Sequence, residues 1–371
     1  MSLLLLFFFV ACHTRSSPVA PPPADQSPPL ADSAPRTESP PGSEVTDWRA
    51  CGIDGHQHLT KGNMDSAADN LLATMDATEV QRVLLIPPPQ SAEKPAAGRY
   101  DADAFDELVA AHPDRLGAIG GGGTLAPTLH GSALSGMAPT AAELDDFEAE
   151  ARALAADGIA GFGEFAILHL SYRQSHPYVE VPADHPMFLR LADVAADVGL
   201  PIDIHLELVS EDMSTPMPYF KSAPMGNNPP ALSENQSAFE RLLAHNRDAT
   251  IIWAHVGWDN TGHADVGTLR GLLERNDNLI FALKMLDEPG PVQVIEHRPL
   301  DLSGTIRPEW LALLEDYPDR FVLGADEFMP GHHGESPGAP STSGTWSILD
   351  QLPADLAYEL ACDNPRAIYA L

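Results

Sequence analysis

Residues 250–258 read TIIWAHVGW, a run of apolar and β-branched residues that contains one histidine near its end. An apolar run of this length is typical of a strand buried on both faces, as strands of a parallel sheet are. Similar runs occur at residues 279–285 (LIFALKM) and at residues 321–326 (FVLGAD), the second of which ends in Asp326. Short buried strands that recur along a chain favour an α/β fold.

Runs of this kind alternate with amphipathic segments. We expect strands at residues 52–59, 81–87, 115–120, 159–168, 201–208, 250–256, 279–285 and 321–326. We expect helices at residues 65–78, 101–112, 141–157, 185–198, 234–245, 266–276, 307–317 and 347–371. This alternation predicts a (β/α)8 TIM barrel, with a doubly wound open sheet as the alternative.

The N-terminal segment has a different composition. Residues 3–11 (LLLLFFFVA) are too few to span a bilayer but suit the core of a signal peptide. They run into Cys12, and the sequence FVAC resembles the lipobox of bacterial lipoproteins, which implies lipidation of Cys12. We therefore expect a signal peptide over residues 1–12, a proline-rich disordered tether over 13–47, and the barrel over 48–371. An ordinary signal peptide is the alternative.

Charge and cysteine content constrain partners and location. The net charge of −32 disfavours nucleic acids and anionic lipid surfaces, so we expect a small-molecule substrate and membrane contact only through an N-terminal lipid anchor. The chain is expected to be exported, as an outer-membrane lipoprotein or as a periplasmic or cell-surface protein. Cys51 and Cys362 either form a disulfide in such an oxidising compartment or remain two separate thiols.

Polar side chains stand at the ends of four expected strands. His56 and His58 are two residues apart, so both point to one face of their strand. His205, His255 and Asp326 each follow an apolar run. In a barrel these strand ends surround one mouth, where the chemistry is placed. Imidazoles with a carboxylate suit Zn²⁺, with Mn²⁺ or Fe²⁺ as alternatives.

Together, Gly55-His56-Gln57-His58, His205, the AHVGW sequence of residues 254–258, Asp326 and the DNPRA sequence of residues 363–367 resemble the amidohydrolase superfamily. The resemblance extends to its amidohydrolase-related branch, which includes aminocarboxymuconate-semialdehyde decarboxylase and lactonases. It implies that His56, His58, His205 and Asp326 bind a divalent metal and that His255 and Asp326 act in catalysis. The implied reaction is hydrolysis of a small ester, lactone or amide by metal-activated water.

Two residues and the reaction type leave alternatives open. Glu164 is either a direct ligand, in the extreme a bridge between two ions, or a carboxylate that orients a ligand imidazole; one ion is favoured and two are possible. Lys284, inside an apolar run, either binds a substrate carboxylate or phosphate or pairs with an acid such as Asp287. A non-oxidative decarboxylase and a catalytically inactive binding lipoprotein are the alternative functions.

Overall fold

The computed structural model describes residues 47–94, 96–171, 177–216, 228–285, 293–329 and 342–371. These residues belong to one compact unit, Glu44–Leu371. The expected signal peptide, Cys12 and almost all of the expected tether lie outside the described residues. Within them, no helix is both long enough and apolar enough to cross a bilayer.

The described strands build one mainly parallel sheet in the order β3-β2-β1-β12-β11-β10-β7-β5-β4. Their bounds are β1 (Ile53–Leu59), β2 (Arg82–Leu85), β3 (Leu116–Ala118), β4 (Gly120–Gly121), β5 (Phe162–His169), β7 (Ile202–Leu206), β10 (Ile251–Val256), β11 (Leu279–Leu283) and β12 (Phe321–Leu323). Short additions are β13 (Glu327–Met329) beside β1, β6 (Val179–Glu180) beside β5, and the separate pair of β8 (Met213–Ser214) and β9 (Ala231–Leu232).

The two ends of this path are parts of one strand, so the sheet closes on itself. Ile119 alone separates β3 from β4. The Ile119 amide donates to the carbonyl of Leu85 at 2.8 Å, on the side of β2, and the Gly120 amide donates to the carbonyl of Gly161 at 3.0 Å, on the side of β5. With β3 and β4 counted together, the ring has eight strands, which confirms the predicted (β/α)8 barrel over the open sheet.

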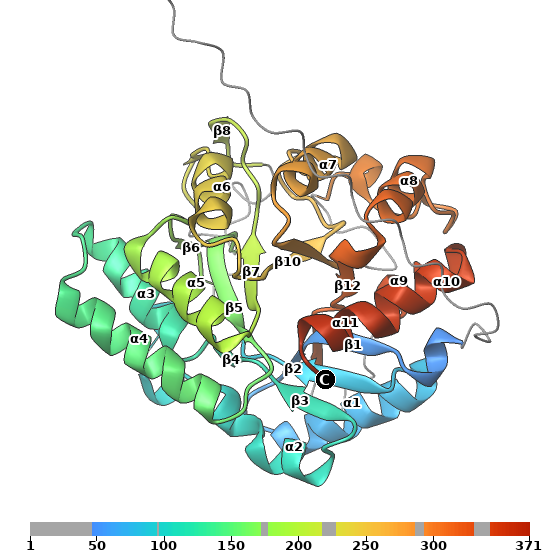
Figure 1. Ribbon diagram of the computed structural model, residues 1–371, viewed down its shortest axis with the longest axis horizontal. Coiled ribbons are helices and arrows are strands. Elements are labelled where there is room, and N and C mark those ends of the chain that lie inside the picture. The colour runs from blue at the N-terminus through green and yellow to red at the C-terminus, as the bar shows by residue number, and fades with distance from the viewer. Residues whose placement is uncertain (1–46, 95, 172–176, 217–227, 286–292, 330–341) are drawn as a thin grey trace, which may run out of the picture. The chain divides into compact units, whose positions relative to one another are not determined.

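Helices surround this ring, and Figure 1 shows them on the outside with the strands between them. They are α1 (Met64–Thr78), α2 (Asp106–Ala111), α3 (Leu125–Ser135), α4 (Ala141–Ala156), α5 (Pro186–Val198), α6 (Gln236–His245), α7 (Val266–Arg275), α8 (Pro308–Asp316), α9 (Thr342–Trp346), α10 (Ala354–Tyr358) and α11 (Asn364–Ile368).

Four helical segments differ from the expectation, among them α9, which precedes the helix expected from residue 347. Helix α3 was not predicted, because Pro127 and Gly131 lower helix propensity within a short segment. The expected helix at residues 101–112 begins as a 3-10 turn before α2. The single helix expected over residues 347–371 is divided, with α10 beginning after Pro353 and a π-helical turn preceding α11. Prolines that cannot donate to the preceding turn favour such breaks.

Two apolar clusters hold the barrel together. The larger packs the outward faces of the strands against the helices. The smaller joins Leu84 of β2 to Ile252 of β10 and Val322 of β12. These strands lie on different sides of the ring, so the smaller cluster fills the barrel interior, as expected for this fold. The site is built on top of this packed interior.

A disulfide joins Cys51, just before β1, to Cys362, in the turn between α10 and α11, with 5.5 Å between the Cα atoms. Of the two possibilities for these cysteines, the structure has the bridge. It links positions 311 residues apart in the chain. It therefore ties the first strand to the C-terminal helices.

We expect the double substitution Cys51→Ala and Cys362→Ala to lower the free energy of unfolding by roughly 2–5 kcal/mol, because a bridge over a long loop restricts the unfolded chain. Urea unfolding of the oxidised wild type and of the double variant measures this difference. Equal midpoints and slopes would show that the bridge contributes nothing to stability.

Candidate metal centre

Every polar residue predicted at a strand end lies at one end of the barrel, which we call the mouth. Parallel strands place their C-terminal ends at the same edge, and the ring brings those ends around a common axis. The side chains come from five strands or the residues after them: His56 and His58 of β1, Glu164 of β5, His205 of β7, His255 of β10, and Asp326 shortly after β12.

Glu164 lies between two pairs of imidazoles. Its Oε1 is 3.1 Å from Nδ1 of His205 and 3.0 Å from Nε2 of His255. Its Oε2 is 3.6 Å from Nε2 of His56 and 3.5 Å from Nε2 of His58. Only 2% of its side chain is exposed. Each carboxylate oxygen therefore serves its own pair of histidines.

Asp326 completes the group of polar side chains at the mouth. Its Oδ1 is 3.0 Å from Nε2 of His58, and its Oδ2 is 3.5 Å from Nδ1 of His255. Oδ2 also accepts a short hydrogen bond from the Lys284 ammonium, which lies 4.1 Å from the ring centroid of Trp258. The proposed partner Asp287 is outside the described residues. The observed partner of Lys284 is thus the site carboxylate itself.

The backbone is in the left-handed region at two of these residues. His255 has a φ of 65° and Asp326 a φ of 52°. A residue with a Cβ adopts this conformation at a cost on the order of 1–3 kcal/mol, and such residues concentrate at functional sites. Asp326 is held there by its amide, which donates to the carbonyl of His56 at 2.8 Å.

The two histidines of β1 are oriented by partners on their far side. Nδ1 of His58 donates to the carbonyl of Ile86 at 2.7 Å. Nδ1 of His56 lies 3.2 Å from Oδ2 of Asp203. Both rings therefore turn Nε2 toward Glu164, and their Nε2 atoms are 3.3 Å apart. Hydrogen bonds of this type fix the tautomer and direction of metal-binding imidazoles.

Sequence reasoning missed a polar chain beside His205. Oε1 of Glu207 is 3.6 Å from Nε2 of His205, and it accepts from the Asn260 amide at 2.9 Å. The Trp258 indole donates to Oδ1 of Asn260 at 2.7 Å. The ring of His169 lies 4.6 Å from that of His205. Glu207 stands two residues after His205, so the same-face spacing that linked His56 to His58 would have indicated it.

Burial and neighbouring charges set the protonation of the site. Burial raises the pKa of Glu164, but His56, His205 and His255 outweigh it and hold that pKa well below its usual value. For Asp326, burial is likewise outweighed by Lys284 and His255, and its pKa is well below normal. Burial lowers the pKa of His255 to about 3, despite Asp326 and Glu164. Both carboxylates are ionised and His255 is neutral at pH 7.

This donor set fits a divalent metal. Its members form three overlapping groups whose ligand atoms lie within 4.8 Å of one another: His56 with His58 and Glu164; His56 with His255 and Asp326; and Glu164 with His205 and His255. Nδ1 of His255 is buried and has no hydrogen-bond partner among the described residues. Ionised carboxylates and neutral imidazoles are the forms that ligate metals. The structure thus contains a His/Glu site that could hold a metal ion.

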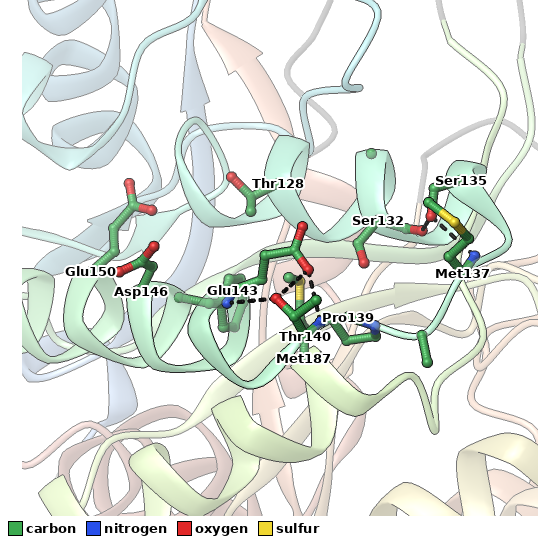
Figure 2. A pocket seen from close by; sticks show the side chains of 13 residues that line it. Thr128, Ser132, Ser135, Met137, Pro139, Thr140, Glu143, Asp146, Glu150 and Met187 are labelled. Carbon is green, nitrogen blue, oxygen red and sulfur yellow. Dashed lines mark hydrogen bonds between the residues drawn. The ribbon is translucent and has the colours of Figure 1, made fainter.

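A separate cavity of about 540 Å³ lies away from the strand ends. Residues of α3, α4 and the segment between them line it, together with Met187 of α5. Figure 2 shows Glu143, Asp146 and Glu150 of α4 along this cavity. None of the residues expected in the site contributes to its wall, so it belongs to the outer helices and not to the metal centre.

No protein-family model matches the chain, and no curated protein does either. Solved structures give weak similarities. A protein of Agrobacterium tumefaciens, solved in its apo form, is 13% identical with a TM-score of 0.46, covering 86% of this chain and 94% of that one. Amidohydrolase 2 of Bifidobacterium longum subsp. infantis is 15% identical with a TM-score of 0.34, covering 86% and 98%.

An amidohydrolase of Mycobacterium avium subsp. paratuberculosis K-10 is 12% identical with a TM-score of 0.41, covering 81% of this chain and 74% of that one. Two of these three proteins bear the name amidohydrolase. The hydrogen bonds of this chain close its strands into a ring, and this ring establishes a (β/α)8 barrel. Side chains that could hold a metal ion lie at the mouth of the barrel.

Proposed function

We propose that this chain is a metal-dependent hydrolase of the amidohydrolase type, which cleaves a small ester, lactone or amide. One observation carries the proposal: the two oxygens of Glu164 each face a separate pair of imidazoles. Hydrogen bonding alone does not account for this arrangement, because the Nε2 atoms of His56 and His58 face each other at 3.3 Å and Nδ1 of His255 has no hydrogen-bond partner among the described residues.

The sharing of Glu164 favours two ions over the single ion that the sequence favoured. His56 and His58 would hold one ion with Oε2 of Glu164, and His205 and His255 would hold the other with Oε1. Asp326 would contribute to the first. Imidazole and carboxylate donors suit Zn²⁺ best, ahead of Mn²⁺ or Fe²⁺. When bound, such ions polarise a carbonyl oxygen and lower the pKa of bound water.

The chain's own residues supply orientation and proton transfer. Asp326 is ionised and lies in contact with His58 and His255, so one of its Oδ atoms can accept the proton of the attacking water and pass it to the leaving group. Lys284 holds this carboxylate in place and keeps it charged. In this assignment His255 is a ligand, in place of the acid–base role that the family resemblance implies.

The test is a substrate panel with and without metal. We expect the purified protein to hydrolyse at least one class among p-nitrophenyl esters, aromatic lactones and anilides, to lose this activity on dialysis against a chelator, and to regain it with Zn²⁺. Carbon dioxide release from carboxylated substrates without hydrolysis would support the decarboxylase instead. Full metal content with no turnover of any class would support an inactive binding protein.

Metal binding should release protons at pH 7. Burial lowers the pKa of His205, but Glu164 and Glu207 raise it to about 9, so the metal-free imidazole is protonated. A metal requires the neutral ring. The raised pKa stabilises the metal-free fold below the unfolded value of about 6.5, and this contribution is lost as the pH rises through 9.

We therefore expect zinc affinity to rise from pH 6.5 to 9, with at least one proton released per chain at pH 7. Isothermal titration calorimetry of the metal-free protein, in buffers with different ionisation enthalpies, counts these protons. A heat that does not depend on the buffer would contradict the protonated state of His205.

We also propose that the protein is exported and anchored through Cys12. The FVAC sequence and the Cys51–Cys362 disulfide support this, because structural disulfides persist in oxidising compartments. Metabolic labelling with a fatty-acid analogue should mark the wild type and not Cys12→Ala. Equal labelling of the two proteins would rule out the anchor.

A further inference from the structure

Three cationic side chains gather at the mouth next to the metal centre. Nζ of Lys61 lies 5.6 Å and Nζ of Lys94 lies 5.9 Å from the ring centroid of Tyr100. The Tyr100 hydroxyl donates to the carbonyl of Leu59 at 3.2 Å. Leu59 ends β1 and directly follows His58. We call Lys61, Lys94 and Arg99 the cation cluster.

Within the described residues, the cation cluster contains no ion pair with a carboxylate. Lys61 donates to the carbonyl of Arg99 at 2.7 Å. Arg99 donates to the carbonyls of Lys94 at 2.9 Å and Ala92 at 2.8 Å. Burial lowers the pKa of Lys94, and the charges of Lys61 and Arg99 lower it further. These positive charges therefore repel one another, and none of them is paired with a described carboxylate.

The cation cluster differs in this respect from the arginines of the outer helices. The chain has 53 Asp and Glu against 21 Lys and Arg, and most described arginines on the outer helices lie beside a carboxylate. Like charges brought together without counter-ions cost free energy that a bound anion would recover. A ligand with a negative charge would therefore offset the repulsion within the cation cluster.

Hydrogen bonds hold the cation cluster in position. The Gln90 side chain donates to the carbonyl of Tyr100 at 2.6 Å, and the Ala92 amide donates to Nδ1 of the buried His130 in α3 at 3.1 Å. The segment that carries Lys94 and Arg99 is therefore fixed at both ends. A group held in its binding position loses less conformational entropy when a ligand arrives.

An exposed aromatic ring lies on the other side of β1. Phe328 of β13 pairs with His58 in register, and the two ring centroids are 4.3 Å apart. Half of Phe328 is exposed, which is unusual for a large apolar residue at this point of a strand. It offers an apolar surface next to a candidate metal ligand. The end of β1 thus presents a cationic side and an apolar side.

We propose that the cation cluster binds the anionic group, a carboxylate or a phosphoryl group, of a small molecule whose apolar part lies against Phe328. This inference rests on the proposed function and specifies its substrate class: esters, lactones or amides that also carry a negative charge. The cluster supplies the positive charge that attracts such a substrate to a protein with an overall charge of −32.

The test uses simple probes that the protein cannot hydrolyse. Benzoate, phenylphosphonate and the neutral benzamide are titrated calorimetrically into the metal-free and the zinc-loaded full-length protein. The variants are Lys94→Met, the charge-retaining Lys94→Arg, and Arg241→Met as a control that removes one positive charge from the outer helix α6. Removal of one close charge is expected to weaken anion binding about five- to tenfold.

We expect at least one anion to bind the metal-free protein more tightly than benzamide does, to bind Lys94→Met about five- to tenfold more weakly, and to bind Lys94→Arg and Arg241→Met as it binds the wild type. A preference between benzoate and phenylphosphonate identifies the anionic group. Equal binding of the three probes, or an unchanged affinity in Lys94→Met, would overturn the inference.

The zinc-loaded arm separates this inference from the proposed function. Anion binding that requires zinc and ignores Lys94 would overturn the cation cluster as a subsite and leave the metal centre standing. Lys94-dependent anion binding in a protein that takes up no metal would support the cation cluster as a subsite and contradict the metal centre. For a hydrolysed substrate class, kcat/KM should favour the anionic member over its neutral analogue, and this preference should fall in Lys94→Met.

Discussion

Glu164→Gln is expected to weaken zinc binding by about 10²- to 10³-fold and to abolish detectable hydrolysis. The substitution keeps the shape of the side chain and removes its charge. Because the carboxylate is buried between four imidazoles, the substitution replaces one of its two ligand oxygens by an NH2 group, which cannot bind a metal, and removes the negative charge that both proposed ion positions share. Removing one member of a buried charged group commonly costs 3–5 kcal/mol. Competition with a zinc chelator of known affinity measures the change.

The matched control is Glu240→Gln. Glu240 lies on α6 and pairs with Arg275 at the surface, so its loss removes the same charge without touching the site. Zinc affinity and activity should stay at the wild-type level in this control. If Glu164→Gln binds zinc as the wild type does, then Glu164 is not a ligand and the assignment of two ion positions is wrong.

Asp326→Asn is expected to lower kcat/KM by about 10²- to 10⁴-fold, the usual range for loss of a general base. The amide keeps an oxygen toward His58 and loses the ability to accept a proton. Steady-state kinetics on the best substrate of the panel measures the loss. The decrease should appear mainly in kcat, with KM much less affected.

The fold needs a separate control, because Asp326→Asn leaves the Lys284 ammonium buried beside a neutral group. The double variant Asp326→Asn with Lys284→Met removes that unpaired charge. We expect the double variant to have a higher unfolding midpoint than Asp326→Asn alone, close to that of the wild type. It should nevertheless remain inactive. Activity within tenfold of the wild type in either variant would exclude Asp326 as the proton acceptor.

Local sequence patterns were sufficient to predict the barrel and the positions of its polar strand ends. Apolar runs such as IIWA in β10 identify strands buried on both faces, and the spacing of His56 and His58 places both rings on one face. The closed ring then brings these strand ends together. The histidine and Asp326 positions follow from those two facts.

Other features depend on contacts between distant parts of the chain. Which oxygen of Glu164 faces which imidazole depends on how β1, β5, β7 and β10 are placed around the ring, and no local pattern encodes it. The partner of Lys284 is 42 residues away, whereas the sequence offered the nearby Asp287. Helix α3 was missed because its packing against β5 and α4 overrides the low propensity of Pro127 and Gly131.

The most direct test is the metal content of the purified protein after chelation and reconstitution with zinc, measured by inductively coupled plasma mass spectrometry beside a protein assay. We predict about two zinc ions per chain, as in other sites where a carboxylate links two ions. A folded protein that retains no zinc, or any other divalent metal, would contradict a metal centre at the mouth and the hydrolase built upon it.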